Sequence, residues 1–457
     1  MKKWCIELGL PHMEMDLPWD QPVPEDRIPD VEKYLINDVR STRAIIKHID
    51  ADFRARQILA SLSGLSVCNT NRQHSEKLIF GDIPWDTKPD LVYTDLRIQF
   101  PGYEFDQFAP GKEKSTYKGQ KVGEGGWVDS TPGIYENVAL LDVASMHPSS
   151  IIELNLFGEY TKNFQKLLDI RIAIKQKDFV KAMEIMPEIE PFVTIPHEGY
   201  DIKGAKGLSD ALKVVINSVY GLTAASFPNK FRDERNIDNI VAKRGALFMV
   251  DLKEFVEKAG FKVVHVKTDS IKIPDATPEI IAQVSEFGKQ YGYTFEHEVT
   301  YDRFCLVNDA AYVARKTIVP EEGEPYVKWE AVAAQFQHPV VFKNLFSKEE
   351  ILPKDYVEVK KVAKGHMYLV NDESGHKQFI GKFGAFVPVL GGRRLVRIDG
   401  DKESAVTGTK DFKWELDHVA MDEKDGMDVD IAYFQNLVDA AKQQIEKYGS
   451  YTEFTRP

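Results

Sequence analysis

Two aspartates, Asp142 and Asp269, each follow an apolar strand-like run, and Lys213 lies between them in the chain. The run before Asp142 is Val-Ala-Leu-Leu, and the one before Asp269 is Val-Val-His-Val-Lys-Thr. Phosphoryl transfer assisted by two metal ions needs carboxylates to hold the ions and a cation to hold the triphosphate. The order carboxylate, basic segment, carboxylate therefore predicts this chemistry.

The basic segment is predicted to be a helix over residues 209–220. Lys213, Asn217 and Tyr220 are spaced i, i+4, i+7, so they share one face of it. Gly221 is predicted to end the helix as a left-handed cap. Taken alone, such a stripe is more typical of the polar surface of an amphipathic helix.

Isolated features of this kind have ordinary structural explanations. Arg171 and Lys175, spaced i, i+4, fit a solvated helix face, Asp142 alone could cap a helix, and Asp269 alone could sit in a turn. The three segments together, in this order, favour a functional site instead.

The composition indicates a soluble, multi-part globular protein. At 457 residues the chain exceeds one ordinary core, so two to four subdomains are expected. No apolar run approaches the roughly 18 residues of a membrane span, and the N-terminus lacks signal-peptide features. Three scattered cysteines (Cys5, Cys68, Cys305) predict a reducing, cytoplasmic location and no disulfide framework or zinc site.

Net charge argues weakly against a nucleic-acid partner. Subtracting 71 acidic from 59 basic residues gives −12, whereas Lys and Arg drive phosphate binding. The distribution is uneven, however. Between Lys203 and Arg244 eight basic residues face four acidic ones, and a second basic cluster comprises Lys112, Lys114, Lys118 and Lys121.

Hydrophobic patterning and turn residues predict the remaining elements. They are a helix over 31–62, a loop-rich connector over 101–136, a strand over 138–143, a helix over 161–186 that stops before Pro187, a hairpin over 262–273 with Asp269 in its turn, and a third region from about 335 that closes with a helix over 431–448.

Three segments resemble the motifs of family B DNA polymerases of the bacteriophage type. Asp142-Val-Ala-Ser145-Met146-His147-Pro-Ser is similar to motif A, an Asp followed by Ser-Leu-Tyr-Pro-Ser. Residues 213–221 match motif B, Lys-x3-Asn-Ser-x-Tyr-Gly, at every defined position. Lys267-Thr268-Asp269-Ser270 resembles motif C, Asp-Thr-Asp-Ser. The resemblance covers most of the chain.

Weaker matches lie outside these motifs. Gly123-Glu124-Gly125-Gly126 resembles the Tyr-x-Gly-Gly linker, with Gly123 at the Tyr position, and residues 334–339 are similar to phage relatives. Tyr34 and Asp38 resemble the third exonuclease motif, Tyr-x3-Asp. Only 33 residues precede Tyr34, so the other two exonuclease motifs are expected on a second polypeptide, in a longer chain, or lost.

The resemblance implies an α+β fold, that of a right-hand polymerase with palm, fingers and thumb plus an exonuclease-domain remnant. The expected boundaries are 1–62 for the remnant, 63–136 for the connector and start of the palm, 137–158 for palm, 159–221 for fingers, 222–334 for palm and 335–457 for thumb.

The implied activity is template-directed addition of deoxynucleotides to a primer 3′ end, with primer-template DNA and deoxynucleoside triphosphates as partners. Asp142, Asp269 and the Val143 carbonyl would hold two Mg²⁺ ions. The implied nucleotide-binding residues are Ser145, Met146, His147, Arg171, Lys175, Lys213, Asn217 and Tyr220. The implied DNA-binding residues are Gly125, Gly126, Thr268, Ser270, Tyr312 and Arg315.

Three departures from the family pattern leave alternatives open. Lys267 replaces the first Asp of motif C. It is either an exposed strand residue or a contact to a primer phosphate. His147 replaces the Tyr that excludes ribonucleotides, so it either keeps that role or only packs locally. Ala310 stands where a primer-gripping Lys-x-Tyr motif would place its lysine, and Arg315 or Lys316 are candidate substitutes.

A second hypothesis is a catalytically inactive polymerase-like subunit that binds DNA. Lys267 and the missing lysine at 310 favour it, and the retention of Asp142, Lys213 and Asp269 opposes it. A small-molecule phosphotransferase is a distant third, because the chain has no Gly-x4-Gly-Lys-Ser/Thr loop. If the protein is viral, the host cytoplasm is its expected location.

Overall fold

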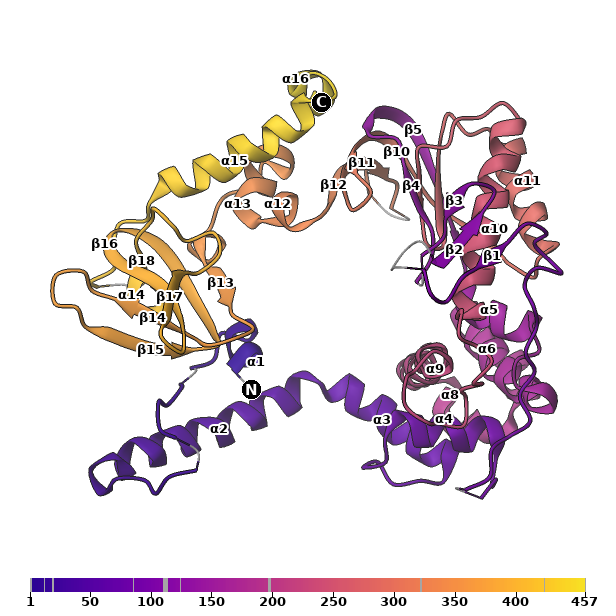
Figure 1. The fold of residues 1–457 in the computed structure, drawn as a ribbon, viewed down its shortest axis with the longest axis horizontal. Coiled ribbons are helices and arrows are strands. Elements are labelled where there is room, and N and C mark those ends of the chain that lie inside the picture. The colour runs from indigo at the N-terminus through magenta and orange to yellow at the C-terminus, as the bar shows by residue number, and fades with distance from the viewer. Residues whose placement is uncertain are drawn as a thin grey trace. The chain divides into compact units, whose positions relative to one another are not determined.

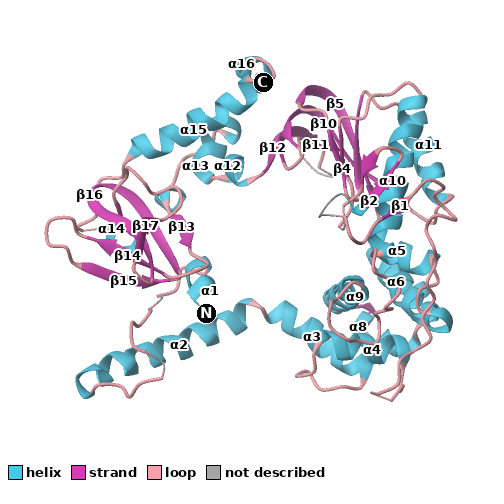
Figure 2. Ribbon diagram, viewed as in Figure 1, coloured by secondary structure: helices cyan, strands magenta, loops and turns pink. Residues whose placement is uncertain are grey.

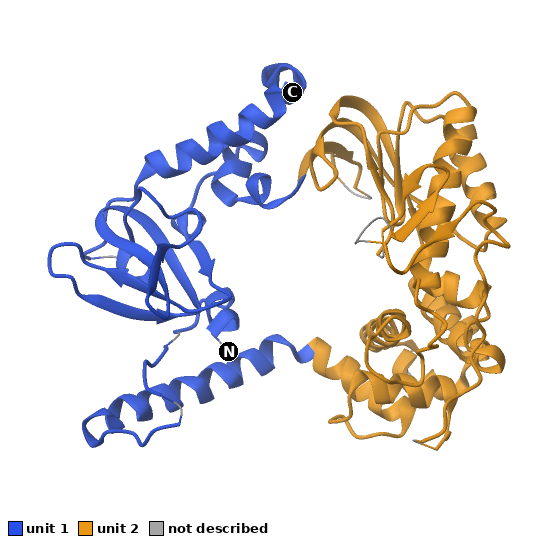
Figure 3. Cartoon of the chain, viewed as in Figure 1, with its two compact units in different colours: residues 1–50, 331–457 blue, residues 51–330 orange. Residues whose placement is uncertain are grey.

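The chain folds into two compact units of mixed helix and strand (Figure 2, Figure 3). One comprises residues 51–330, and the other comprises residues 1–50 with 331–457. The computed structural model describes every residue except 1, 12, 19, 85, 110–113, 124, 196–198, 321–322, 423 and 457. The mixed α and β composition confirms that part of the fold prediction.

The larger unit is built around a seven-stranded sheet of order β12-β11-β10-β5-β9-β8-β4 (Figure 1). The strands are β4 (Val128–Ser130), β5 (Gly133–Val143), β8 (His265–Lys267), β9 (Ser270–Pro274), β10 (Phe295–Asn308), β11 (Ala311–Ile318) and β12 (Tyr326–Val332). The predicted strand and the predicted hairpin with Asp269 in its turn are both confirmed. Strand β5, which contains Asp142, and strand β9, which begins directly after Asp269, are neighbours.

Both faces of the central strands are covered, which explains their continuous apolar sequence. Leu141 and Ile271 belong to the main core, which they share with the helices of this unit. Leu140, Tyr301 and Phe304 belong to a smaller core on the opposite face. Asp142 on β5 and Ser270 on β9 are half-buried at the strand ends that carry the aspartates.

The helices of the larger unit are α3 (Asp50–Ser63), α4 (Asn71–Phe80), α5 (Met146–Glu153), α6 (Thr161–Lys175), α7 (Phe179–Ile185), α8 (Glu190–Val193), α9 (Ile202–Thr223), α10 (Ile240–Lys258) and α11 (Pro278–Lys289). The helices predicted over 161–186 and 209–220 fall among them with different bounds. The single helix predicted over 161–186 is wrong, because the chain turns at Lys177, which has a φ of 60°.

Helix α9 begins earlier and ends later than predicted. The Asp201 side chain accepts a hydrogen bond from the Gly204 N–H and caps its start. The prediction that Gly221 caps the helix is wrong, because α9 continues through it. Asn229 donates to the Leu222 carbonyl at 3.0 Å and Asn236 to the Thr223 carbonyl at 3.3 Å. These side chains satisfy the terminal carbonyls that a glycine cap would otherwise satisfy.

The predicted connector over 101–136 contains short strands as well as loops. These are β1 (Glu104–Phe105), β2 (Ser115–Tyr117) and β3 (Gln120–Lys121), which form a three-stranded sheet, followed by β4. A separate two-stranded sheet pairs β6 (Thr194–Ile195) with β7 (Gly199–Tyr200). Lys112 of the second basic cluster and Glu124 of the linker motif lie outside the described residues.

The smaller unit combines helices from both ends of the chain with a six-stranded sheet. Its strands are β13 (Glu358–Lys361), β14 (His366–Val370), β15 (Lys377–Gly381), β16 (Phe383–Asp399), β17 (Lys402–Ala405) and β18 (Trp414–Leu416). Its helices are α1 (Lys2–Glu7), α2 (Ile28–His48), α12 (Ala334–Gln337), α13 (Pro339–Phe342), α14 (Asp417–Ala420), α15 (Ile431–Glu446) and α16 (Tyr451–Thr455). The predicted closing helix corresponds to α15.

The long helix predicted over 31–62 is wrong. Helix α2 ends at His48, and α3 begins at Asp50, because Ile49 leaves the helical conformation with φ −89° and ψ 21°. Among the described residues, no helix has both the length and the apolar character required to span a bilayer.

Candidate active site

The sheet brings the two aspartates together. Asp142 lies opposite Ser270 in the antiparallel pairing of β5 with β9. The N–H of Val143 donates to the carbonyl oxygen of Asp269 at 2.9 Å. The backbone of one aspartate segment is thus bonded to the other, although the two are far apart in sequence.

The two carboxylates interact electrostatically. The pKa of Asp142 is raised to about 7, first by burial and then by the charge of Asp269, with smaller contributions from Glu298 and Glu296. Like charges in a partly buried site stabilise the protonated form, and a bound cation would relieve them.

The donor set fits Mg²⁺, which proteins hold through one or two carboxylates together with substrate phosphates and water. A cage of protein side chains alone is not available: within the part of the chain that the structure describes, no group of three His, Cys, Asp or Glu residues could hold a metal ion.

Sequence reasoning missed three charged residues of this site, which are Lys272, Glu296 and Glu298. Glu296 lies opposite Asp142 in the pairing of β10 with β5, and a bulge follows it, between His297 and Val299. Lys272 is 3% exposed on β9, and its ammonium lies 5.3 Å from the centroid of the Tyr312 ring. Burial lowers its pKa to about 8, and the nearby charge of Lys267 contributes.

A signal for Lys272 was present in the sequence, because residue 272 lies two positions after Ser270 and so shares its face of the strand. Glu296 and Glu298 could be found only from the register of β10 against β5, which the sequence does not specify.

The turn that carries Asp269 is held by the linker motif. Thr268, with a φ of 58°, donates its N–H to the Trp127 carbonyl at 3.0 Å. Gly126 has a φ of 142°, and a Cβ there would come within 3.0 Å of the Thr268 side chain. A Cβ on Gly123 would come within 2.9 Å of the Gly126 oxygen. Packing therefore explains these two glycines, while the predicted DNA contacts of Gly125 and Gly126 stay predictions.

Motif A opens helix α5. Ser145 precedes the helix with a φ of 61° and a ψ of 50°, and its carbonyl accepts the first helical hydrogen bond, from Ser149 at 3.0 Å. The Met146 side chain is buried against Gly245 of α10, where a Cβ would come within 2.5 Å of its sulfur. The first N–H groups of α5, beside Asp142, form an end that favours anions.

His147 and Tyr220 join motif A to motif B. Their rings stack with centroids 3.9 Å apart and an interplanar angle of 20°. Burial lowers the pKa of His147, against the opposing charge of Asp269, so its imidazole is neutral at neutral pH. Asn239 donates to the Tyr220 hydroxyl at 3.4 Å. The stack sets the N-terminal turn of α5 against the polar face of α9.

The predicted phosphate-binding cations on α6, Arg171 and Lys175, lie near Glu296. Lys213 and Asn217 are exposed on α9. On α6, which packs against α9, Lys175 lies 3.9 Å from Glu296, the residue opposite Asp142. Burial lowers the pKa of Arg171, and the charges of Asp210 and Glu296 oppose that effect. Arg171 and Lys175 therefore share an acidic neighbour with the aspartate pair.

The predicted DNA-binding residues on β11 are engaged within the sheet. Arg315 donates to Asp302 at 2.9 Å and lies 5.9 Å from the centroid of the Trp329 ring. Lys316 forms an ion pair with Glu330. The Tyr312 ring lies beside Lys272. A lysine is thus adjacent to Tyr312 in space, although the sequence has Ala310 at the expected position.

Part of the basic segment is structural. Lys243 and Arg244 are 1% and 2% exposed. Lys243 donates to the carbonyls of Val122 and Gly123, and Arg244 donates to the carbonyl of Tyr291 at 2.8 Å. These two cations, both counted in the basic stretch from Lys203 to Arg244, are therefore bonded to backbone carbonyls in the interior.

The predicted exonuclease residues lie in the smaller unit. Tyr34 and Asp38 line a cavity of about 350 Å³ on α2, together with Lys2, Glu14 and Lys382. Burial raises the pKa of Tyr34, and the charges of Asp38 and Glu14 add to it.

Parts of the chain are similar to known proteins. No family model matches the chain. It is 27% identical over 181 residues to DNA polymerase II of Escherichia coli (strain K12), covering 36% of this chain and 22% of that protein. It is 25% identical over 273 residues to the DNA polymerase of Pyrococcus glycovorans, covering 52% and 34%.

The structure is similar to that of the family B DNA polymerase from Pyrobaculum calidifontis, with a TM-score of 0.45, 15% identity, and coverage of 93% of this chain and 57% of that one. The matches span only about a fifth to a third of the length of the two curated relatives. Over those parts, the chain is related in sequence to DNA polymerases.

Proposed function

We propose that the chain is a template-directed DNA polymerase of family B type that adds deoxynucleotides to a primer 3′ end. The observation that carries the proposal is the pairing of β5 with β9, which sets Asp142 beside the Asp269 segment, with Lys175 of α6 3.9 Å from Glu296, the residue opposite Asp142. Sequence similarity to DNA polymerases supports the same activity.

Asp142, Asp269 and the Val143 carbonyl would hold two Mg²⁺ ions, which supply activation of the primer hydroxyl and stabilisation of the pyrophosphate. The N–H groups of Ser145 and Met146 bind triphosphate oxygens at the start of α5.

The nucleotide is held from α6 and α9. Lys213, Arg171 and Lys175 neutralise the phosphates from α9 and α6, two helices that pack together. Asn217 and Tyr220 line the base-pair pocket, with His147 stacked beneath.

The remaining assignments are parts of the same proposal. Residues 137–158 and 222–334 form the palm, 159–221 the fingers and 335–457 the thumb. Thr268, Ser270, Tyr312 and Arg315 contact DNA together with the two linker glycines, Gly125 and Gly126.

Residues 1–62 are proposed to complete an exonuclease site only with a second chain. Support comes from the exposed apolar residues of α2: Leu35 is 56% exposed, Ile36 52% and Val39 70%. Apolar residues gathered in this way are typical of an interaction surface.

An inactive DNA-binding subunit is the second candidate, favoured by Lys267, which occupies the place of a motif C carboxylate at the end of β8. A primer-extension assay with Mg²⁺ separates the two. The catalytic proposal predicts extension that depends on Asp142 and Asp269, whereas the subunit proposal predicts duplex binding without extension.

A further inference from the structure

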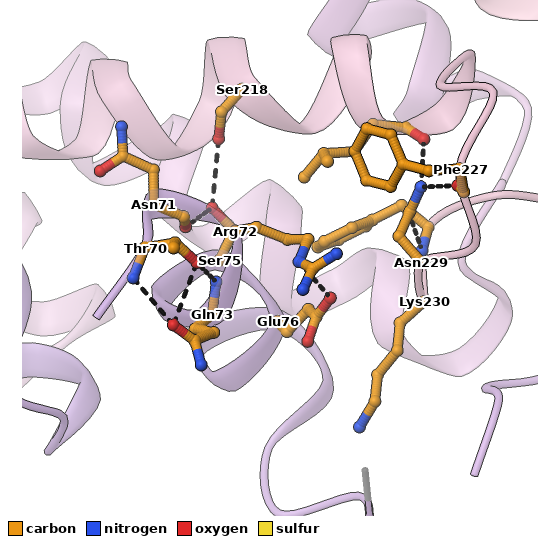
Figure 4. Close-up of polar contacts among 12 residues, drawn as sticks. Thr70, Asn71, Arg72, Gln73, Ser75, Glu76, Ser218, Phe227, Asn229 and Lys230 are labelled. Atoms are coloured by element: carbon orange, nitrogen blue, oxygen red, sulfur yellow. Dashed lines mark hydrogen bonds and ion pairs between the residues drawn. The ribbon is translucent and has the colours of Figure 1, made fainter. Parts of the chain in front are cut away.

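Helix α2 leaves apolar side chains in solvent that a helix of this kind normally buries. Helix α4 shows the usual arrangement. Its Ile79 and Phe80 are buried, and its Ser75 forms a hydrogen bond with Ser218 of the neighbouring helix α9, with the hydroxyl oxygens 3.2 Å apart (Figure 4). Helix α2 differs, because a row of its apolar side chains is exposed.

The exposed row of α2 has the spacing of a helix that pairs with another helix. It comprises Ile28, Leu35, Val39 and Ile46, which are between 45% and 70% exposed. These residues are seven, four and seven positions apart in the chain, so they form one narrow stripe along the 21-residue helix. Contact positions of a coiled coil repeat in this way. The stripe therefore indicates a helix as its partner.

The stripe is symmetric about its midpoint, at position 37. If a second copy of α2 packs against it in the opposite direction, Ile28 faces Ile46 of the second copy, and Leu35 faces Val39 of the second copy. A two-fold axis makes each of these contacts occur twice. A parallel pair of copies would also match apolar residues with one another, so the charges must decide the direction.

The charges along α2 favour the antiparallel direction. Residues 25–38 contain five acidic and two basic residues, whereas residues 39–48 contain three basic residues and no acidic one. Those three, Arg40, Arg43 and Lys47, are exposed, as is Glu32. An antiparallel pair sets the acidic half of each helix against the basic half of the other, with Glu32 nearly level with Arg43 of the second copy. A parallel pair would place like charges together.

Another side of α2 is already covered within the chain. Ser41 is 2% exposed, and helix α1 packs against α2. Tyr34 and Asp38 line the cavity of about 350 Å³ described above. With 3.6 residues per turn, these three residues point away from the stripe. Pairing through the stripe would therefore leave this side of α2 unchanged.

We infer that the stripe binds α2 of a second copy of the chain in an antiparallel two-helix pair. Charge complementarity between the two halves of the helix identifies the occupant, because only an identical helix in the opposite direction repeats every match. A contact of about three heptads is small for a permanent interface, so the dimer forms reversibly. The inference goes beyond the proposed function and does not depend on it.

The test is sedimentation equilibrium of the full chain over about 1–100 μM, in about 50 mM salt, where ion pairs are less screened. The average mass should rise with concentration from that of one chain toward that of two. Val39→Glu should weaken dimerisation about tenfold or more, because it buries a charge in the stripe. Val319→Glu is the matched control, since Val319 is 75% exposed and lies outside α2, and it should dimerise as wild type does.

A charge exchange tests the direction of the pair. Arg43→Glu should weaken dimerisation by about fivefold, and the addition of Glu32→Lys should restore it, because the exchanged charges meet across the interface. Within one helix these two positions are about 16 Å apart, too far for a direct contact. Both variants retain Val39, so they test the inference even if Val39→Glu fails to fold.

Three results would overturn the inference. The first is a protein that stays monomeric over the whole concentration range, which is also the result expected if a different polypeptide covers the stripe. The second is a dimer whose affinity is the same in Val39→Glu as in wild type, because the interface would then lie elsewhere. The third is failure of Glu32→Lys to restore the dimer of Arg43→Glu, which would exclude the antiparallel pair.

Discussion

Asp142 combines partial burial with three acidic neighbours. Its protonation should therefore make the stability of the metal-free protein depend on pH. Its pKa of about 7 in the folded state lies above the value of about 4 expected for an unfolded aspartate. Between these values the folded state binds a proton that the unfolded state does not. Stability contributed by this group is present at low pH and is lost as pH rises toward 7.

Replacement of Asp142 by Asn should therefore stabilise the metal-free protein above pH 7. We expect a gain of about 1–2 kcal/mol at pH 8, discounted for the partial exposure of the group, and no gain near pH 4. Urea unfolding in EDTA at the two pH values measures it, with the exposed Asp401→Asn as control. Equal stabilities at pH 8 would show that the pKa of Asp142 is not raised in the folded protein.

His147 is predicted to select the sugar of the incoming nucleotide, because its neutral ring is fixed against Tyr220. His147→Ala should raise ribonucleotide incorporation relative to deoxyribonucleotide incorporation by about tenfold or more, the scale of lost steric discrimination. Single-nucleotide extension with each sugar gives the ratio. A ratio that does not change would restrict His147 to a packing role.

At the residue scale, the sequence was informative where the charged groups are close along the chain. Lys213, Asn217 and Tyr220 could be grouped by helical spacing, and Asp269 could be placed in a hairpin turn. Glu296 and Glu298 could not be found, because only the pairing of β10 with β5 brings them to Asp142.

At the element scale, close packing of α5 against α10 positions the start of α5. Gly245 is the contact point, since a Cβ there would meet the buried Met146 side chain. This contact sets where the Ser145 and Met146 N–H groups lie.

Gly245→Ala should destabilise the protein by about 1–3 kcal/mol, the usual result of overpacking a core, and should slow primer extension by displacing α5. Gly221→Ala is the matched control, because a Cβ at that position of α9 meets no atom within 4 Å. It should be neutral or stabilising by about 0.5–1 kcal/mol, owing to helix propensity. Similar destabilisation of both variants in thermal unfolding would contradict the packing argument.

The element boundaries show where local patterning was insufficient. The spacing of apolar residues predicted continuous helices over 31–62 and 161–186. The first is interrupted at Ile49 and the second at Lys177, and neither residue is a glycine or proline. Gly221 looked like a helix cap, but asparagines that follow in the chain take over the terminal carbonyls. Caps supplied by side chains outside the helix are not visible in a local pattern.

At the scale of the whole molecule, a net charge of −12 coexists with local basic sites. Buried Lys243 and Arg244 bond backbone carbonyls, whereas Lys213 and Lys175 are exposed, and Lys175 lies 3.9 Å from Glu296. The total charge therefore says little about the binding surface, and the division into two units could be expected from length alone.

The chain alone is predicted not to proofread. Exonuclease chemistry also uses two metal ions, and Asp38 alone cannot position both. Incubation with Mg²⁺ and a mismatched primer, without nucleotides, should leave the primer intact. Shortening that requires Mg²⁺ and disappears in Asp38→Ala would show that a complete site exists within this chain.

The most direct test of the proposed catalytic site is primer extension by Asp142→Asn and Asp269→Asn, with duplex binding measured in parallel. Each variant should lose more than about 100-fold in extension rate, since even outer-shell changes at metal sites cost up to this factor. Duplex affinity should stay within a few-fold of wild type. Extension near the wild-type rate in either variant would contradict the assignment of Asp142 and Asp269 as the metal-binding pair.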